Sequence, residues 1–293
     1  MTRSLFGADR TVSTLRGGRE GASPTAQENR WAQGAEPEGP SVLVVGSGKG
    51  GVGKSVLSVL LGASLAAQGH RVLLFDADHN LGNLHVLLAI RPVARLEALL
   101  QGELGPQDLI RPVSERLWLL PGDSGIEALH HLEPFDRARL QHRLSSVYDQ
   151  FDVVIVDAAA GIDGVVRTAT MGATWLLAVA TPEPTALTDA YALMKIVNLQ
   201  APRLPIAVLL NRCDDPEEGR AAYDKLAVAC ERFLRRGVRY LGALPEDSAI
   251  RAAVRDPARC LARLEQSEAA RTLRDGVVDR MELPEPTRSA RSP

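Results

Sequence analysis

The chain has 293 residues, of which 45% are hydrophobic and 24% are charged, a composition typical of a soluble globular protein. Its 34 Lys and Arg against 36 Asp and Glu give a formal net charge of −2. This balance argues against a protein that binds nucleic acid over its whole surface, although a local basic patch is still allowed. The sequence has no run of about 18 apolar residues, and its N-terminus lacks the apolar core of a secretory signal. We therefore expect a cytoplasmic protein.

Residues 1–40 are rich in Gly, Ser, Thr, Arg, Glu and Pro, and we expect a disordered tail there. Residues 41–283 alternate apolar runs with helical patterns, and residues 284–293 form a second loose end. The expected strands are 41–46, 71–76, 117–120, 152–157, 175–180, 204–211 and 238–244, and the expected helices are 54–68, 136–148, 184–199, 216–234 and 257–281. Continuous apolar runs indicate strands covered on both faces. The alternation predicts one α/β domain with a doubly wound, mostly parallel sheet and helices on both faces.

A glycine-rich segment follows the first expected strand and opens a helix. Residues 47–55 read Ser-Gly-Lys-Gly-Gly-Val-Gly-Lys-Ser. Glycines let backbone N–H groups point at phosphate oxygens, and the helix N-terminus adds positive potential. Lys54 is expected to contact the β- and γ-phosphates, and Ser55 to bind Mg²⁺. The residues expected to hold the nucleotide here are Gly48, Lys49, Gly50, Gly51, Val52, Gly53, Lys54 and Ser55.

Carboxylates follow two further strands. Asp76-Ala77-Asp78 ends the second strand, and Asp157 ends the strand Asp-Val-Val-Ile-Val-Asp, the Walker B pattern. Ligands of such sheets bind at the carboxyl ends of the strands, so we expect Asp76 and Asp78 to face the nucleotide. Asp157 is expected to hold Mg²⁺ through water.

The spacing of one motif favours ATP over GTP as the bound nucleotide. Residues 211–214 read Asn-Arg-Cys-Asp, which has the outline of the Asn-Lys-x-Asp guanine reader of GTPases. A GTPase also needs Asp-x-x-Gly after the Walker B strand, whereas Asp157 and Gly161 are four residues apart. ATP is therefore the favoured nucleotide, with Asn211 and Arg212 as base-side residues.

A second lysine indicates the family. Only four of the 34 basic residues are lysines, and Lys49 and Lys54 share one loop. The position of Lys49 resembles the deviant Walker A motif of the MinD/ParA ATPases. The resemblance implies that Lys49 crosses a dimer interface and neutralises charge on the transferring phosphoryl group of the partner's nucleotide. It also implies that Asp78 positions the attacking water, that Asp76 lies near the magnesium, and that residues 245–247 form an adenine-side loop.

Several segments look like the flagellar-number regulators of the MinD group, the FlhG/FleN type. They are 76–90, 119–126, 157–162 and, most specifically, 181–195. The resemblance implies an ATP-dependent homodimerisation switch that hydrolyses ATP to ADP and phosphate and regulates flagellar number and placement. It implies an FlhF-like GTPase and flagellar basal-body or regulatory proteins as partners.

Three residues depart from the family pattern, and one motif matches it weakly. His79, Asn80 and His85 stand where the family usually has other residues, which puts hydrolysis or its coupling to partners in doubt. Residues 9–16 resemble only loosely the motif that stimulates the FlhF-like GTPase.

Other members of the same class remain alternatives. A ParA-type DNA or plasmid partition ATPase needs a basic surface, which the neutral charge balance does not obviously supply. A MinD-type septum-site ATPase and a noncatalytic nucleotide-binding scaffold also stay open. An iron–sulfur carrier of this fold needs paired cysteines, and Cys213, Cys230 and Cys260 are 17 and 30 residues apart, so we expect buried reduced thiols.

The C-terminal helical pattern bears on membrane association. Ala269, Leu273, Val277 and Met281 share one helical face. Residues 267–283 carry three Arg against four acidic residues and no aromatic residue, whereas an interfacial helix is basic and aromatic. We therefore expect weak or no membrane association, and a cytoplasmic location with the inner face of the cell membrane as an alternative.

Overall fold

The computed structural model describes residues 39–78, 82–92, 104–122, 142–169, 172–283 and 285–286. All of them lie within one unit, Glu36–Pro293. The tail expected over residues 1–40 and the loose end expected over residues 284–293 fall almost wholly outside the described residues. Both therefore stay predictions.

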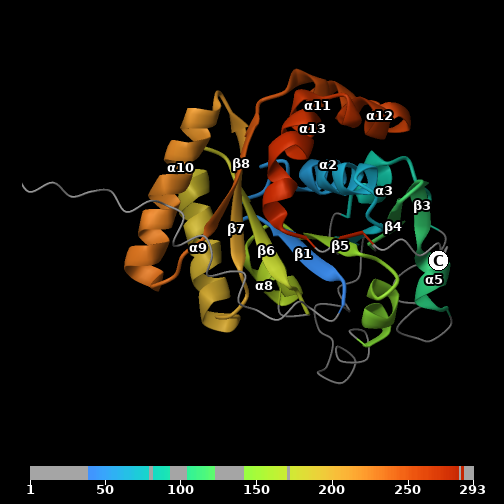
Figure 1. Cartoon of the computed structure of the whole chain (residues 1–293), viewed down its shortest axis with the longest axis horizontal. Helices are drawn as coiled ribbons and strands as arrows, with labels where there is room; N and C mark the ends of the chain where they lie inside the picture. Colours follow the sequence, from blue (N-terminus) through green and yellow to red (C-terminus); the bar gives the residue numbers. More distant parts are fainter. Residues whose placement is uncertain are drawn as a thin grey trace, which may run out of the picture. The chain divides into compact units, whose positions relative to one another are not determined.

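Eight strands form one sheet in the order β3-β4-β2-β5-β1-β6-β7-β8 (Figure 1). They are β1 (Ser41–Gly46), β2 (Val72–Ala77), β3 (Arg111–Ser114), β4 (Leu117–Leu120), β5 (Val153–Ala158), β6 (Trp175–Ala180), β7 (Ile206–Cys213) and β8 (Arg239–Pro245). Neighbouring strands run parallel except for β3 and β4, which are antiparallel. The mostly parallel sheet predicted from the apolar runs is confirmed.

Helices cover both faces of this sheet. The longer ones are α2 (Lys54–Ala67), α8 (Ile162–Ala169), α9 (Pro184–Gln200), α10 (Pro216–Ala229) and α11 (Ser248–Val254). Successive strand residues point to opposite faces. In β1, Val42 and Val44 therefore pack in the core layer of α8, α9 and α10, and Leu43 and Val45 pack in the layer of α2. The sheet is doubly wound, as expected.

The prediction of a single C-terminal helix over 257–281 is wrong. The segment is a chain of short elements: η2 (Pro257–Arg259), α12 (Cys260–Glu265), α13 (Glu268–Thr272), η3 (Leu273–Val277) and η4 (Asp279–Met281). The break lies at Ser267, whose hydroxyl accepts a hydrogen bond from the N–H of Ala270 at 3.1 Å and donates to the carbonyl oxygen of Leu264 at 2.6 Å. A buried serine that caps a new helix competes with continuation of the preceding one.

The sequence did not predict the edge strand β3 or the helices α3 (Leu84–Leu87), α5 (Pro106–Leu109), α8 and α11. The helix expected over 216–234 is α10 continued by a π-helical segment, η1 (Cys230–Leu234), which ends at Arg235 with φ 54°. The helix expected over 136–148 is described only from residue 142, where it is helical to residue 148. Within the described ranges, no helix is long and apolar enough to cross a membrane.

The central strands bring the expected site residues to one edge of the sheet. β5 lies between β1 and β2, and its register sets Asp157 beside both Val45 and Asp76. The phosphate loop leaves β1 at this edge, and the segment that leads to the short helix α3 (Leu84–Leu87) leaves β2 there. The carboxyl ends of parallel strands are where α/β proteins bind ligands.

Candidate functional site

The loop between β1 and α2 has the tight backbone expected of a phosphate loop. Gly51 and Gly53 have φ values of 83° and 93°, which side chains other than glycine rarely adopt. A Cβ atom on Gly53 would lie 2.6 Å from Nδ2 of Asn211, and one on Gly48 would lie 2.1 Å from the carbonyl oxygen of Asp189. Helix α9, which carries Asp189, therefore packs directly on the loop.

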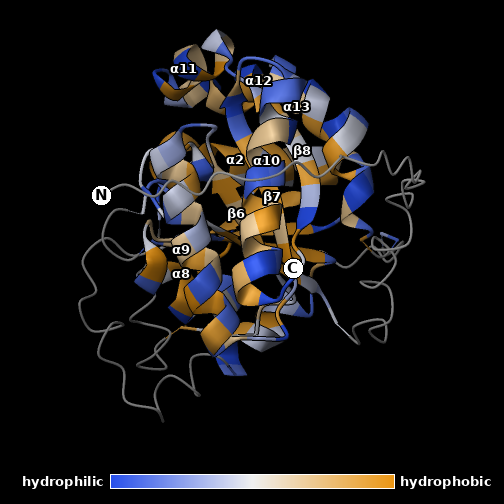
Figure 2. Cartoon of the chain, turned by 90° about the vertical axis from the view of Figure 1, so that its left-hand side faces the viewer, coloured by the Kyte–Doolittle hydropathy of each residue, from blue (hydrophilic) through white to orange (hydrophobic). Residues whose placement is uncertain are grey.

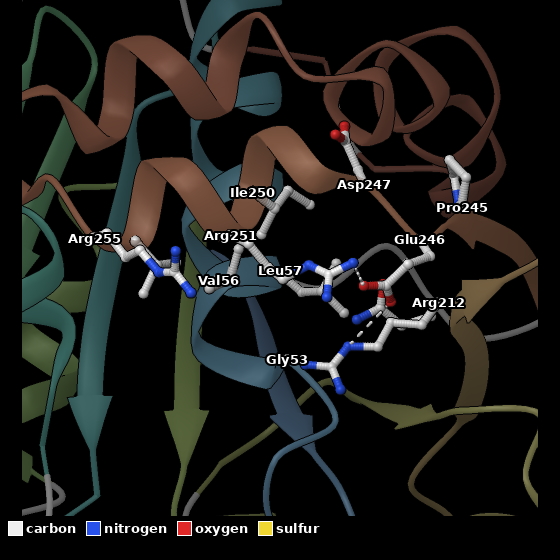
Figure 3. A pocket seen from close by; sticks show the side chains of 12 residues that line it. Gly53, Val56, Leu57, Arg212, Pro245, Glu246, Asp247, Ile250, Arg251 and Arg255 are labelled. Carbon is white, nitrogen blue, oxygen red and sulfur yellow. Dashed lines mark ion pairs between the residues drawn. The ribbon is translucent and has the colours of Figure 1, made fainter.

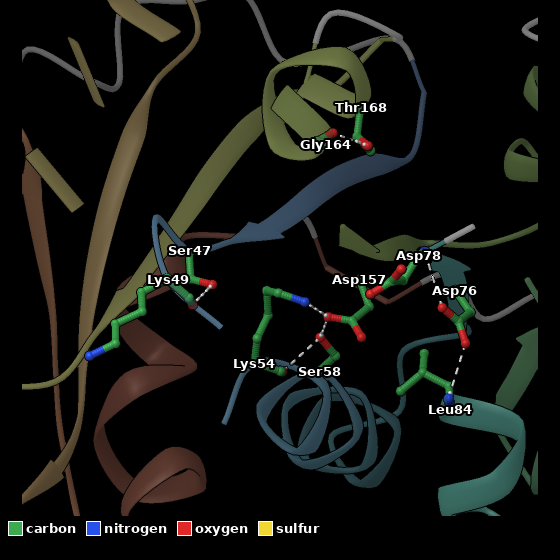
Figure 4. Close-up of polar contacts among 10 residues, drawn as sticks. All are labelled: Ser47, Lys49, Lys54, Ser58, Asp76, Asp78, Leu84, Asp157, Gly164 and Thr168. Carbon is green, nitrogen blue, oxygen red and sulfur yellow. Dashed lines mark hydrogen bonds and ion pairs between the residues drawn. The ribbon is translucent and has the colours of Figure 1, made fainter. Parts of the chain in front are cut away.

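Lys54 lies at the centre of a buried polar cluster (Figure 4). Its Nζ is 3.1 Å from Oδ1 of Asp157, and only 8% of the Lys54 side chain and 2% of the Asp157 side chain are exposed. Ser58 Oγ lies 3.2 Å from the same carboxylate oxygen and 3.1 Å from the carbonyl oxygen of Lys54. The Walker B carboxylate and the P-loop lysine are thus brought together in one ion pair.

Asp76 is held by two backbone N–H groups. Its Oδ1 accepts a hydrogen bond from Asp78 at 3.2 Å, and its Oδ2 accepts one from Leu84, the first residue of α3, at 3.0 Å. Burial raises the pKa of the Asp76 carboxyl to about 7, and the nearby charge of Asp157 also raises it, against the two hydrogen bonds. A cation placed here would favour the ionised carboxylate.

The oxygen donors of the site are of the kind that magnesium binds. In the described part of the chain, no group of three or more His, Cys, Asp or Glu could hold a metal ion. Mg²⁺ is usually bound by one or two carboxylates, waters and substrate phosphates. The expected donors Ser55, Asp76 and Asp157 are of the right chemical type for such a shared site.

Lys49 does not join this cluster. Its side chain is exposed and extends away from Lys54 and Asp157 (Figure 4). The hydroxyl of Ser47 donates to the carbonyl oxygen of Lys49 at 2.8 Å, which fixes the backbone beneath it. Asp78 is half-buried at the end of β2, beside Asp76.

A cavity of about 420 Å³ opens next to the phosphate loop (Figure 3). Asn211 and Arg212 line it from the end of β7, and residues 245–247 line it from the end of β8, so both base-side predictions fall in one pocket. The amide Nδ2 of Asn211 donates to the carbonyl oxygen of Val52 at 2.7 Å. This bond uses one of the two N–H donors of the amide, so one N–H and the acceptor oxygen are left.

Arg251, Ile250 and Val254, which the sequence did not single out, also line the pocket. Glu246 lies between two guanidinium groups, 3.7 Å from Nε of Arg212 and 3.0 Å from Nη2 of Arg251. Ile250 and Val254 of α11 add apolar surface. The apolar spacing at 250 and 254 is a weak helical signal that could have located this wall.

Of the departures noted in the sequence, only His85 is described. It lies on α3 and is half-buried, and its Nδ1 is buried without a hydrogen-bond partner. His79 and Asn80, like the loosely matching motif at residues 9–16, lie outside the described residues. Cys213, Cys230 and Cys260 are buried free thiols, as expected.

Comparison with known proteins agrees with this geometry. Residues 43–257 match the family described as CobQ/CobB/MinD/ParA nucleotide binding domain. The chain is 38% identical to the antiactivator FleN of Pseudomonas aeruginosa over 213 residues, which cover 73% of this chain and 76% of FleN. It is 34% identical to the flagellum site-determining protein YlxH of Helicobacter pylori over 215 residues, covering 73% and 72% of the two chains.

A solved structure of the same architecture is that of MinD in the MinC:MinD cell division protein complex of Aquifex aeolicus. The match has a TM-score of 0.67 and 25% sequence identity, and it covers 85% of this chain and 98% of the other.

Proposed function

The chain belongs to the CobQ/CobB/MinD/ParA family of nucleotide-binding proteins, and from this membership we propose that it is an ATP-dependent dimerisation switch that regulates flagellar number and placement. The observation that carries the proposal is the loop with two lysines in a chain 38% identical to FleN and 34% identical to YlxH. FlhF-like GTPases and basal-body or regulatory proteins of the flagellum are the proposed partners. The proposed location is cytoplasmic.

In the proposed reaction, water attacks the γ-phosphorus of ATP, the bond to the β–γ bridging oxygen breaks, and ADP and phosphate leave. Lys54 holds the β- and γ-phosphates, and Ser55 and Asp157 hold the metal, with Asp76 beside it. Bound Mg²⁺ supplies positive charge to the phosphate oxygens. Asp78 orients the attacking water, and Lys49 of a second subunit neutralises the developing charge.

Adenine is the proposed base, because the spacing of Asp157 and Gly161 departs from the Asp-x-x-Gly of GTPases and Asn211 lines the pocket with an acceptor. Nδ2 of Asn211 donates one of its two N–H groups to Val52, and the amide oxygen is left as an acceptor beside the pocket. The amino group of adenine can donate to this oxygen. ATP should therefore bind more tightly than GTP in a competition titration. Equal or tighter binding of GTP would contradict this reading and would make Asp214 a base-reading residue.

The function is tested by deleting the gene and counting flagella per cell by electron microscopy. Loss of a number regulator should change the count and placement, and re-expression of the wild-type chain, but not of Lys54→Ala, should restore them. Lys225→Ala, an exposed lysine outside the site, is the matched control and should restore them as well.

A MinD-type septum-site ATPase is the second candidate, because the MinD of the MinC:MinD complex shares the fold at a TM-score of 0.67. The same deletion separates the two. Normal flagella with displaced division septa would favour the septum-site role and reject the flagellar one.

A further inference from the structure

The pocket beside the phosphate loop, called the base pocket from here on, is rich in arginine. Arg212 lines it from the end of β7, and Arg251 and Arg255 line it from α11, whereas none of the described residues that line it is aromatic. Proteins cover the flat faces of nucleic-acid bases with aromatic rings or with the planes of guanidinium groups. The arginines are therefore the candidates to cover a base in this pocket.

One carboxylate joins two of these arginines (Figure 3). Oε2 of Glu246 lies 3.7 Å from Nε of Arg212, and Oε1 of Glu246 lies 3.0 Å from Nη2 of Arg251. The two ion pairs connect the end of β7, the end of β8 and helix α11. Glu246 thus holds two planar cations at the edge of one cavity.

These ion pairs leave much of each guanidinium side chain accessible. The exposed fraction is 49% for Arg212, 67% for Arg251 and 40% for Glu246. Ion pairs at such exposed positions contribute little to the stability of a fold. A side chain that is already held in place loses less freedom when a ligand binds, so the same pairs favour ligand binding.

The backbone that carries Arg212 is constrained as well. Arg212 has a φ of 58°, in the left-handed region that residues other than glycine seldom adopt. The preceding residue, Asn211, is tied to the phosphate loop through the carbonyl oxygen of Val52. Conformations of this kind persist where the surroundings impose them, and they cluster at ligand sites.

Helix α11, which presents Arg251, is anchored at its start. The helix lies at one end of the molecule and carries both hydrophilic and hydrophobic residues (Figure 2). Oδ1 of Asp247 accepts a hydrogen bond from the N–H of Ala249 at 2.7 Å, and Oδ2 of Asp247 accepts one from the N–H of Glu268, the first residue of α13, at 2.8 Å. The position of Arg251 over the pocket is therefore fixed from β8 and from α13.

We propose that Arg212 and Arg251, joined by Glu246, form a platform on which the purine base of the nucleotide stacks, with Glu246 as its positioning residue. The inference rests on the proposed binding of ATP. A guanidinium group stacks on an aromatic face through its plane and its charge. Ile250 and Val254 add apolar surface in the same pocket.

The platform sets the affinity for a base and not the choice of base. Every base has a π-face, so stacking does not distinguish adenine from guanine. Arg251→Ala should therefore weaken the binding of ATP and of GTP by the same factor.

Glu246 separates a platform from a purely electrostatic effect. Glu246→Ala removes a negative charge close to an anionic nucleotide, so electrostatics alone predicts tighter binding of ATP. The platform predicts weaker binding, because both guanidinium groups lose the carboxylate that holds them.

The test is isothermal titration of the full chain with Mg·ATP and with magnesium tripolyphosphate, which has the phosphates but no base. Arg251→Ala should raise the dissociation constant for ATP about tenfold and leave that for tripolyphosphate within about twofold. Arg251→Lys should not restore ATP binding, because an ammonium group is not planar. Arg220→Ala, at an arginine of α10 that is ion-paired with Asp224 outside the pocket, is the control and should change neither constant.

The same titrations apply to the positioning residue. Glu246→Ala should raise the dissociation constant for ATP about fivefold without weakening the binding of tripolyphosphate. Glu246→Gln keeps an acceptor for the guanidinium groups and should recover most of the ATP affinity. In the Arg212→Ala/Arg251→Ala background, Glu246→Ala should have little further effect, because Glu246 acts through the two arginines.

Several results would overturn the platform while leaving the proposed function intact. They are ATP binding by Arg251→Ala equal to that of the wild type, rescue by Arg251→Lys, parallel loss of ATP and tripolyphosphate, and tighter ATP binding by Glu246→Ala. A changed ratio of ATP to GTP affinity in Arg251→Ala would show base reading in place of stacking. A wild type that does not bind ATP would instead reject the proposed function. Unchanged thermal unfolding of the variants shows that a loss of binding is not a loss of fold.

Discussion

Lys54 of the phosphate loop should contribute directly to the affinity for ATP. Lys54 is a buried cation beside Asp157, and it is the charge placed to meet the β- and γ-phosphates. Lys54→Ala should raise the dissociation constant for ATP about tenfold or more, because a charge-assisted contact is lost. Isothermal titration measures this, with Lys225→Ala as the control of equal charge change. Unchanged affinity of Lys54→Ala would reject the site.

Asp76 should make stability depend on pH. Its folded-state pKa of about 7 lies above the unfolded value of about 3.9, so the folded chain binds more protons between these values. The free energy of unfolding should therefore fall as pH rises through this window, by at most about 1.4 kcal/mol per pH unit. Asp76→Asn removes the titration and should flatten that slope in urea unfolding at several pH values.

A divalent cation is the control for the Asp76 prediction. Mg²⁺ with nucleotide favours the ionised carboxylate, so it should flatten the slope of the wild type and leave Asp76→Asn unaffected. Equal slopes for the wild type and Asp76→Asn without metal would show that other groups cause the pH dependence.

At the scale of elements, Ser267 decides where the C-terminal segment breaks. Its hydroxyl caps α13 and is 1% exposed. Ser267→Ala should lower the free energy of unfolding by about 1–2 kcal/mol, because the cap is lost and a buried N–H is left unpaired. Urea unfolding measures the change. Ser248→Ala, at an exposed serine whose helix is capped by Asp247, should cost much less, and equal losses would reject the capping role.

The elements that sequence predicts are those with a strong local signal. Continuous apolar runs locate β1 and β5, and glycines and lysines locate the phosphate loop. The sequence does not predict the break at Ser267, because a serine inside a helical pattern gives no sign of whether it will be buried and cap a new helix. Helix α11 was missed because it is short, and with it the pocket wall at Ile250 and Val254. The walls of a pocket come from elements that are distant in sequence, and hydrophobic periodicity does not show which of these elements meet.

At the scale of the whole molecule, the outward orientation of Lys49 bears on how two subunits would associate. Lys54 already serves the buried cluster, and Lys49 extends away from it at an exposed position (Figure 4). A lysine that no group of its own site needs is available to the nucleotide of a second subunit. In the proposed switch, each site is incomplete in the monomer, and ATP, whose γ-phosphate Lys49 would reach, stabilises the dimer. ADP lacks that phosphate and should release it.

Two variants should therefore behave oppositely. Lys49→Ala should bind ATP but stay monomeric and hydrolyse it poorly, because the charge that crosses the interface is lost. Asp78→Ala should bind ATP, dimerise and persist as a dimer, because the attacking water is no longer oriented. Size-exclusion chromatography with light scattering, in ATP and in ADP, distinguishes these states, with phosphate release measured in parallel. Normal ATP-dependent dimerisation of Lys49→Ala, or a wild type that is equally dimeric with either nucleotide, would reject the switch in favour of a static scaffold.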